Sequence, residues 1–274
     1  MHAMKTAASI SIQYNNPFSP FPAKDWKTGF QWAKDAGLDG VELILSDPKL
    51  IDVKSVISEL DRLGLSVATI ATGQAAALEG FCLTSYSEAE RGLAVKRCFE
   101  DIDFSVSLGN RPNVTIGLIR GRGNPKNSAD ERELLKRELY KVAEYAANRN
   151  VKLNLEPINR YEVTLLNSVE DTAAFLDEMG NPPNIGILYD TFHVNIEDCG
   201  QVQTIKRFGD KISHVHFADS NRRLPGEGHL NFSEIKEALE SIGYSNWISL
   251  EMLSIPDAEH VQKNMKRRMG AIFK

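Results

Sequence analysis

Four side chains that can bind a metal ion stand at or near the ends of four separate apolar runs in the second half of the chain. They are Glu156, Asp190, His216 and Glu251. A single polar residue in such a place usually forms an ion pair or a satisfied buried hydrogen bond, because an unpaired buried charge is costly. Four of them, each at the same end of its run, instead predict a shared metal site.

The ligand types select the ion that this site would hold. Three carboxylates and one imidazole favour Mn²⁺, with Co²⁺ or Mg²⁺ as the next choices. Structural zinc sites are typically rich in thiolates, although Zn²⁺ also accepts carboxylate and imidazole ligands. A metal that prefers five or six ligands keeps positions free for two substrate oxygens. The carbonyl and hydroxyl oxygens of a hydroxy-ketone would fit those positions.

Other polar residues near these four indicate how a small substrate would be held. Glu162 and His193 stand six and three positions after the first two ligand residues, within reach of a bound polyol. Arg120 and Arg222 follow the fourth and seventh apolar runs, and arginines at strand ends suit a carboxylate or phosphate group. Gln74, after the third run, is a further hydrogen-bonding candidate.

One further glutamate and three further histidines are interpreted as structural. Glu42 lies inside the second apolar run, where a buried ion pair is expected rather than catalysis. His214 stands two positions before His216 and is expected to pack or to form a bond behind it. His229 and His260 are assigned to the surface or to loops.

These side chains need a scaffold that brings many strand ends together. Strand-like runs alternate with amphipathic helical patterns, and these runs are 8–12, 40–45, 66–71, 114–119, 151–155, 185–189, 212–217 and 247–250. Such alternation predicts a parallel sheet, and about eight units in this length predict a closed (β/α)8 TIM barrel with its active site at the carboxyl ends of the strands. A doubly wound open sheet is the competing fold, but no glycine-rich phosphate motif supports it. Without a linker or composition break, residues 1–274 are predicted to form a single domain.

Composition narrows the possible partners and compartment. The 274 residues carry 32 Lys+Arg and 37 Asp+Glu, a net charge of −5, which argues against nucleic acid or an anionic membrane as the main partner. No apolar run approaches the roughly 18 residues of a membrane span, and residues 1–12 do not resemble a secretory signal. The three cysteines show no metal-ligand spacing, so we expect reduced thiols in a cytoplasmic protein.

Several runs resemble the xylose isomerase-like TIM barrels, and within them the tagatose 3-epimerase group. These runs are LEPINRYE (155–162), YDTFH (189–193), HVHFADSNRRLPGEGH (214–229) and LEML (250–253). Two more, IATGQAAALEGFCLTS (70–85) and IGLIRGRG (116–123), are similar to enzymes that convert 5-keto-L-gluconate to D-tagaturonate in inositol breakdown. The resemblance therefore implies a metal-dependent epimerase of a keto-sugar acid, which would assemble as a dimer or tetramer.

The same resemblance implies roles for individual residues. Glu156, Asp190, His216 and Glu251 match the divalent-metal ligands of the family, and Glu162, His193 and Arg222 match its substrate-contacting positions. Glu156 and Glu251 also match its pair of acid/base carboxylates. Epimerisation beside a ketone removes a proton from one face, leaving an enediolate, and returns a proton to the other face. Two carboxylates meet that need, and either can serve either face.

Other functions remain open on the same residues. A ketose 3-epimerase, an aldose–ketose isomerase such as a hydroxypyruvate isomerase, or a dehydratase would begin with the same proton abstraction. A DNA-repair endonuclease on this barrel would need histidine ligands from early strands, yet no histidine lies between His2 and His193. A non-catalytic sugar-binding module would not need both carboxylates.

Overall fold

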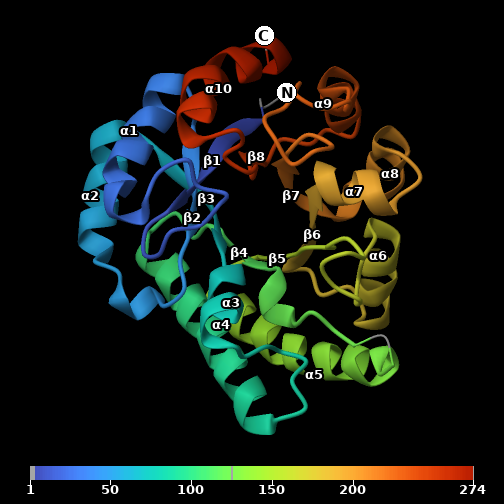
Figure 1. Cartoon of the computed structure of the whole chain (residues 1–274). Helices are drawn as coiled ribbons and strands as arrows, with labels where there is room; N and C mark the ends of the chain where they lie inside the picture. Colours follow the sequence, from blue (N-terminus) through green and yellow to red (C-terminus); the bar gives the residue numbers. More distant parts are fainter. Residues whose placement is uncertain (1–3, 125, 274) are drawn as a thin grey trace.

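Eight parallel strands close into a barrel in the computed structural model of the chain (Figure 1). The strands are β1 (Lys5–Ser11), β2 (Gly40–Ile44), β3 (Ser66–Ala71), β4 (Asn113–Ile116), β5 (Leu153–Leu155), β6 (Ile185–Asp190), β7 (Ile212–Phe217) and β8 (Trp247–Leu250). Each strand pairs with the next, and β1 pairs with β8, where Ala7 lies opposite Ser249. The predicted (β/α)8 TIM barrel is confirmed.

The structure describes residues 4–124 and 126–273. His2 and the start of the segment considered as a secretory signal therefore lie outside the described residues. Within the described ranges, no helix combines the length and apolar character that crossing a bilayer requires.

Helices form an outer ring around the strands (Figure 1). They are α1 (Trp26–Ala36), α2 (Val53–Leu63), α3 (Gly73–Glu79), α4 (Glu88–Ser107), α5 (Ser128–Ala147), α6 (Val169–Glu178), α7 (Thr191–Glu197), α8 (Gln201–Phe208), α9 (Phe232–Ser241) and α10 (Ala258–Phe273). Short 3₁₀ helices span Ala23–Asp25, Pro48–Leu50, Leu118–Arg120 and Gly209–Lys211.

Helix α2 shows how the local sequence sets these elements. The Asp52 side chain accepts a hydrogen bond from the backbone N–H of Ser55, which caps the first turn. Val56 and Leu60, four residues apart, are buried on one face of the helix. Gly64 then ends the helix at φ 62°, a left-handed conformation that glycine adopts without strain.

The barrel interior is partly polar. Thr69 of β3 and Thr115 of β4 share a hydrogen bond between their hydroxyls at 3.0 Å, and Asn154 of β5 donates to the Thr69 hydroxyl. The Ser213 hydroxyl of β7 donates to the side-chain oxygen Oδ1 of Asn154 at 2.8 Å. These four polar side chains of the barrel thus satisfy one another, as buried polar groups usually do.

Three predicted strands, 40–45, 114–119 and 151–155, are longer than the observed Gly40–Ile44, Asn113–Ile116 and Leu153–Leu155. The strand expected over 114–119 ends at Ile116, and the chain then turns into the 3₁₀ helix Leu118–Arg120. The pairing of β4 with β5 stops at Ile116 opposite Leu155, so residues beyond it have no ladder partner. Pro157 follows Glu156 and lacks the N–H that would extend β5. The early end of β4 changes the direction of Arg120, as described below.

Candidate active site

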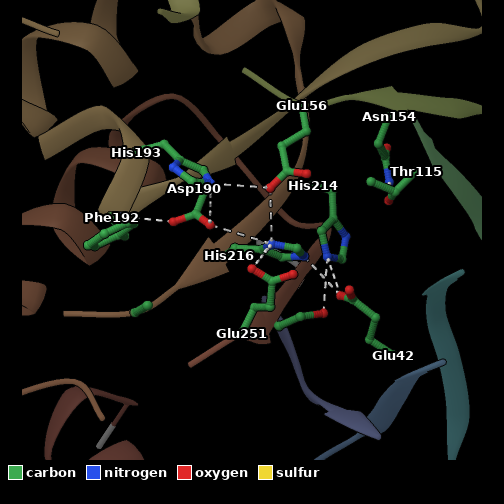
Figure 2. Close-up of polar contacts among 12 residues, drawn as sticks. Glu42, Thr115, Asn154, Glu156, Asp190, Phe192, His193, His214, His216 and Glu251 are labelled. Carbon is green, nitrogen blue, oxygen red and sulfur yellow. Dashed lines mark hydrogen bonds and ion pairs between the residues drawn. The ribbon is translucent and has the colours of Figure 1, made fainter. Parts of the chain in front are cut away.

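The four predicted metal ligands converge at the carboxyl ends of β5 to β8 (Figure 2). Each of Glu156, Asp190, His216 and Glu251 offers one ligand atom, and these atoms lie within 4.8 Å of one another. His216 Nδ1 is 3.8 Å from Glu156 Oε1, 3.8 Å from Asp190 Oδ2 and 3.6 Å from Glu251 Oε2. Strands that are neighbours in the barrel have thus brought residues up to 95 positions apart to one point.

Local structure aims two of these atoms at a common centre. Asp190 ends β6 and caps α7, because its Oδ1 accepts the backbone N–H of Phe192 at 2.8 Å. Its other oxygen, Oδ2, and the Nδ1 atom of His216 are buried and form no hydrogen bond. Buried polar atoms of this kind are normally satisfied. Two such atoms beside two further carboxylates fit a divalent cation with oxygen and nitrogen ligands.

The crowding of carboxylates perturbs their protonation. Burial and the neighbouring Glu251 raise the pKa of Glu156 to about 8. Burial also acts to raise the pKa of Asp190, but the neighbouring Arg222 guanidinium outweighs it and holds that pKa well below its usual range. Burial alone would lower the pKa of His216, yet the surrounding carboxylates raise it well above its usual value. The cluster without a cation therefore retains protons at neutral pH.

Arg222 reaches the cluster from the loop after β7. Its backbone has a φ of 60°, a left-handed conformation that is strained for a residue other than glycine. Its guanidinium lies between the rings of Phe18 and Phe192, at 4.9 and 4.6 Å from their centroids. It donates a hydrogen bond to Glu251 and lies 3.2 Å from Asp190 Oδ2. Stacking and charge pairing together fix this arginine beside the candidate ligands.

His193 and Glu162 are joined by Asn159, which the sequence analysis did not identify. The Asn159 side-chain amide lies 2.8 Å from His193 Nδ1 and donates to Glu162 Oε1 at 2.8 Å. The side-chain oxygen Oδ1 of Asn159 accepts a hydrogen bond from the backbone N–H of Tyr161, which orients the side-chain amide. Burial, only partly opposed by Asp190, lowers the pKa of His193 to about 3, so its ring is neutral. Its other ring nitrogen, Nε2, lies 3.1 Å from the Arg222 guanidinium, which can only donate, so the neutral imidazole helps to hold Arg222 at the site.

A cavity of about 270 Å³ opens directly onto these groups. Seven of the predicted site residues line it, namely Gln74, Glu156, Glu162, His193, His216, Arg222 and Glu251. The Gln74 amide nitrogen donates to the backbone carbonyl of Tyr14 at 3.1 Å, while its buried Oε1 atom has no hydrogen-bond partner. Phe18, Leu118 and Ile158 add apolar walls. The cavity therefore combines apolar surface with a few convergent polar groups, as small-molecule sites do.

Arg120 is not part of this cavity, so the expectation that it reads a substrate carboxylate is wrong. The 3₁₀ helix after β4 turns its fully buried side chain toward the segment that follows β5. Its guanidinium donates to the backbone carbonyls of Glu156, Leu165 and Leu166. Arg120 thus supports the chain around Glu156 from behind.

Two further residues shape the site and were not assigned a role in it. Asp219 follows β7, and its carboxylate accepts backbone N–H groups of Ser220, Gly226 and Leu230, which gives the Arg222 loop its form. Gly117 follows β4, and a Cβ atom there would lie 2.6 Å from Glu156 Oε2. Asp219 stands just after the predicted strand 212–217, whereas for Gly117 the available signal was a glycine inside the predicted strand 114–119. The interpretation of Glu42 as a buried ion-pair partner agrees with its contacts to His214 and His216.

Comparisons with known proteins give the same picture of the chain. Residues 30–269 match the family described as "Xylose isomerase-like TIM barrel". The L-ribulose 3-epimerase of Methylomonas sp. (strain DH-1) is 31% identical over 233 residues, which cover 81% of this chain and 76% of that protein. The 3-dehydro-D-guloside 4-epimerase of Escherichia coli (strain K12) is 26% identical over 231 residues, covering 81% of this chain and 85% of that protein.

A solved structure of an L-ribulose 3-epimerase superposes on nearly the whole chain. The TM-score is 0.81 at 25% sequence identity, and the alignment covers 98% of this chain and 94% of that one.

Proposed function

Because the chain belongs to the xylose isomerase-like TIM barrel family, we propose that it is a divalent-metal-dependent epimerase that inverts a carbon beside the ketone of a sugar. The observation that carries this proposal is the convergence of Glu156, Asp190, His216 and Glu251 on one point, where all but Asp190 line the same cavity. The sequence relatives described above are themselves epimerases of keto sugars or keto-glycosides.

The four residues would hold the cation, for which we propose Mn²⁺ on the basis of three oxygen donors and one nitrogen donor. A cation bound there would supply positive charge that polarises the ketone oxygen of the sugar. This fit rests on the buried Asp190 Oδ2 and His216 Nδ1 atoms, which form no hydrogen bond, and on the mutual distances of the four ligand atoms.

The two glutamates provide the proton transfers in this proposal. Glu156 and Glu251 follow β5 and β8, which are separated by β6 and β7 in the barrel, and both line the cavity. One carboxylate takes the proton from the carbon beside the ketone, and the other returns a proton to the opposite face. Arg222 then donates a hydrogen bond that stabilises the oxygen charge which develops between these steps, and His193 helps to hold its guanidinium in place.

For the substrate we propose a keto-sugar acid of the 5-keto-L-gluconate type, supported by the similarity of residues 70–85 and 116–123. A neutral ketose, inverted at C3, is the second candidate. A neutral substrate is favoured because Arg222 is the one guanidinium among the described residues that line the cavity, and it already pairs with Glu251 and Asp190. No further arginine among these residues is therefore available to pair with a substrate carboxylate. We also propose a cytoplasmic homo-oligomer, a dimer or tetramer, as the resemblance implies.

The proposal is tested by proton NMR in D₂O with Mn²⁺, across neutral ketoses, keto-sugar acids and phosphorylated ketoses. We expect deuterium at the carbon beside the ketone together with the epimeric product. Glu156→Gln and Glu251→Gln should each lower that exchange by at least roughly 100-fold. Glu133→Gln, on the exposed face of α5, is the matched control and should exchange normally.

Three results would contradict the proposal. Full exchange in either glutamine variant would remove the two-carboxylate mechanism. Exchange that survives complete removal of divalent ions would remove the metal requirement. A product with the carbonyl group moved to another carbon, and no epimer, would replace epimerisation by aldose–ketose isomerisation.

A further inference from the structure

Glu42 is a fully buried carboxylate that the proposed chemistry does not use. It lies in the middle of β2, where it pairs in register with Ser9 of β1, on strands that carry none of the proposed metal ligands. Yet its side chain reaches across the barrel to the histidines of β7 (Figure 2). A charged group buried so deeply needs partners, and its partners reveal what it can do.

The main partner of Glu42 is His216. Glu42 Oε2 lies 3.0 Å from His216 Nε2, whereas the opposite ring nitrogen, Nδ1, faces the three carboxylates of the candidate metal site. The imidazole of His216 therefore lies between the Glu42 carboxylate at Nε2 and the proposed cation position at Nδ1. No other described side chain makes a hydrogen bond to either nitrogen of this ring.

We propose that Glu42 is a positioning residue that keeps the hydrogen of His216 on Nε2 and so presents the lone pair of Nδ1 to the cation. A carboxylate can only accept a hydrogen bond, so the ring nitrogen that faces it must donate. A neutral imidazole has one N–H, and placing it on Nε2 leaves Nδ1 free to ligate. This inference rests on the proposed metal-dependent function.

The negative charge of Glu42 adds to this effect. Glu42 Oε2 faces the Nε2 atoms of both His216 and His214, at 3.0 and 3.4 Å. An anionic partner behind a ligating histidine increases the basicity of the other nitrogen, and loss of such partners typically weakens metal binding. Ser9 and Ser249 bring hydroxyls but no opposing charge to this part of the interior.

His214 is the second contact of Glu42 and offers a matched control. His214 Nε2 lies 3.4 Å from Glu42 Oε2 and 3.0 Å from the hydroxyl of Ser249. Ser249→Ala removes a hydroxyl that bonds His214 in the same buried cluster and makes no hydrogen bond to His216. It should therefore leave metal binding unchanged, while Glu42→Gln should not.

The experiment measures Mn²⁺ binding to metal-free protein by electron paramagnetic resonance, with circular dichroism and thermal unfolding in chelator as checks of the fold. We expect one Mn²⁺ per chain in the wild type, Glu42→Gln and Ser249→Ala. The dissociation constant should rise by about 10- to 100-fold in Glu42→Gln alone. If the wild type binds no divalent ion, the proposed function itself fails.

Other outcomes overturn only the role of Glu42. Equal affinity in a folded Glu42→Gln protein would do so. A second Mn²⁺ in the wild type that is lost in Glu42→Gln would make Glu42, His214 and His216 a metal site of their own instead.

A measurement on the wild type covers the case in which Glu42→Gln does not fold. Nitrogen-15 spectra of the histidines, recorded with diamagnetic Zn²⁺ bound, report the protonation of each ring nitrogen. We expect His216 to carry its hydrogen on Nε2. A hydrogen on Nδ1 would refute the proposal.

Discussion

Binding of the proposed cation should release protons, because the metal-free cluster stores them. The pKa of Glu156 is raised to about 8 by burial and by Glu251, and the pKa of His216 is raised well above its usual value by the carboxylates around it. At pH 7 both groups hold a proton in the free site. A cation needs the carboxylate and Nδ1 of the imidazole unprotonated, so it competes with those protons.

The expected size and sign of the effect follow from these two groups. Each proton that must leave changes the apparent affinity by up to about tenfold per pH unit, or about 1.4 kcal/mol. Between pH 6 and pH 7 the affinity for Mn²⁺ should therefore rise by up to about 100-fold. Above pH 8 Glu156 is already ionised, so the slope should fall. Affinity thus increases with pH and never decreases over this range.

Titration calorimetry in two buffers with different ionisation enthalpies measures the number of protons released. We expect about two at pH 7 in the wild type, since two raised pKa values are involved. Glu156→Gln cannot bind that proton in the free site and should release about one fewer. No proton release, with an affinity that stays constant from pH 6 to pH 8, would refute the electrostatic description of the cluster.

Two more predictions concern single side chains. Gly117→Ala places a Cβ atom 2.6 Å from Glu156 Oε2 and should displace that carboxylate. We expect substrate deuterium exchange to fall by roughly 100-fold while the circular dichroism spectrum stays unchanged. Normal exchange would show that the carboxylate tolerates the shift. Asp101 in α4 is 1% exposed, neither of its carboxylate oxygens accepts a hydrogen bond, and burial raises its pKa well above the usual value. Folded protein therefore holds this proton more tightly than unfolded protein, and stability is lost as the pH rises above about 4, by at most roughly 1.4 kcal/mol per pH unit. Urea unfolding in chelator should show that the free energy of unfolding of Asp101→Asn rises relative to that of the wild type between pH 5 and pH 8. A difference in unfolding free energy that stays constant over this range would exclude this titration.

The order of elements and the strand ends were readable from the sequence. The runs 66–71, 212–217 and 247–250 coincide with β3, β7 and β8, because short apolar runs separated by amphipathic helices leave few alternatives. Parallel strands of a barrel present their carboxyl ends at one rim. Knowing that a polar residue ends each of four strands was therefore enough to place Glu156, Asp190, His216 and Glu251 together.

The direction of side chains on the loops was decided by the tertiary structure alone. Arg120 and Arg222 looked equivalent in the sequence, since each follows a strand. The 3₁₀ turn after β4 sends the Arg120 side chain into the protein, whereas Asp219 shapes a loop in which a left-handed backbone brings Arg222 to the cluster. Loop backbones have no periodicity that would give such directions in advance.

The partnership of Glu42 with His216 has the same origin. The two residues are 174 positions apart, and their contact exists because barrel closure directs β2 and β7 side chains into one interior. From the sequence, a carboxylate inside an apolar strand indicates only that some partner must compensate its buried charge. Which partner it meets, and which nitrogen of that histidine is left for a cation, depends on distances that only the folded barrel creates.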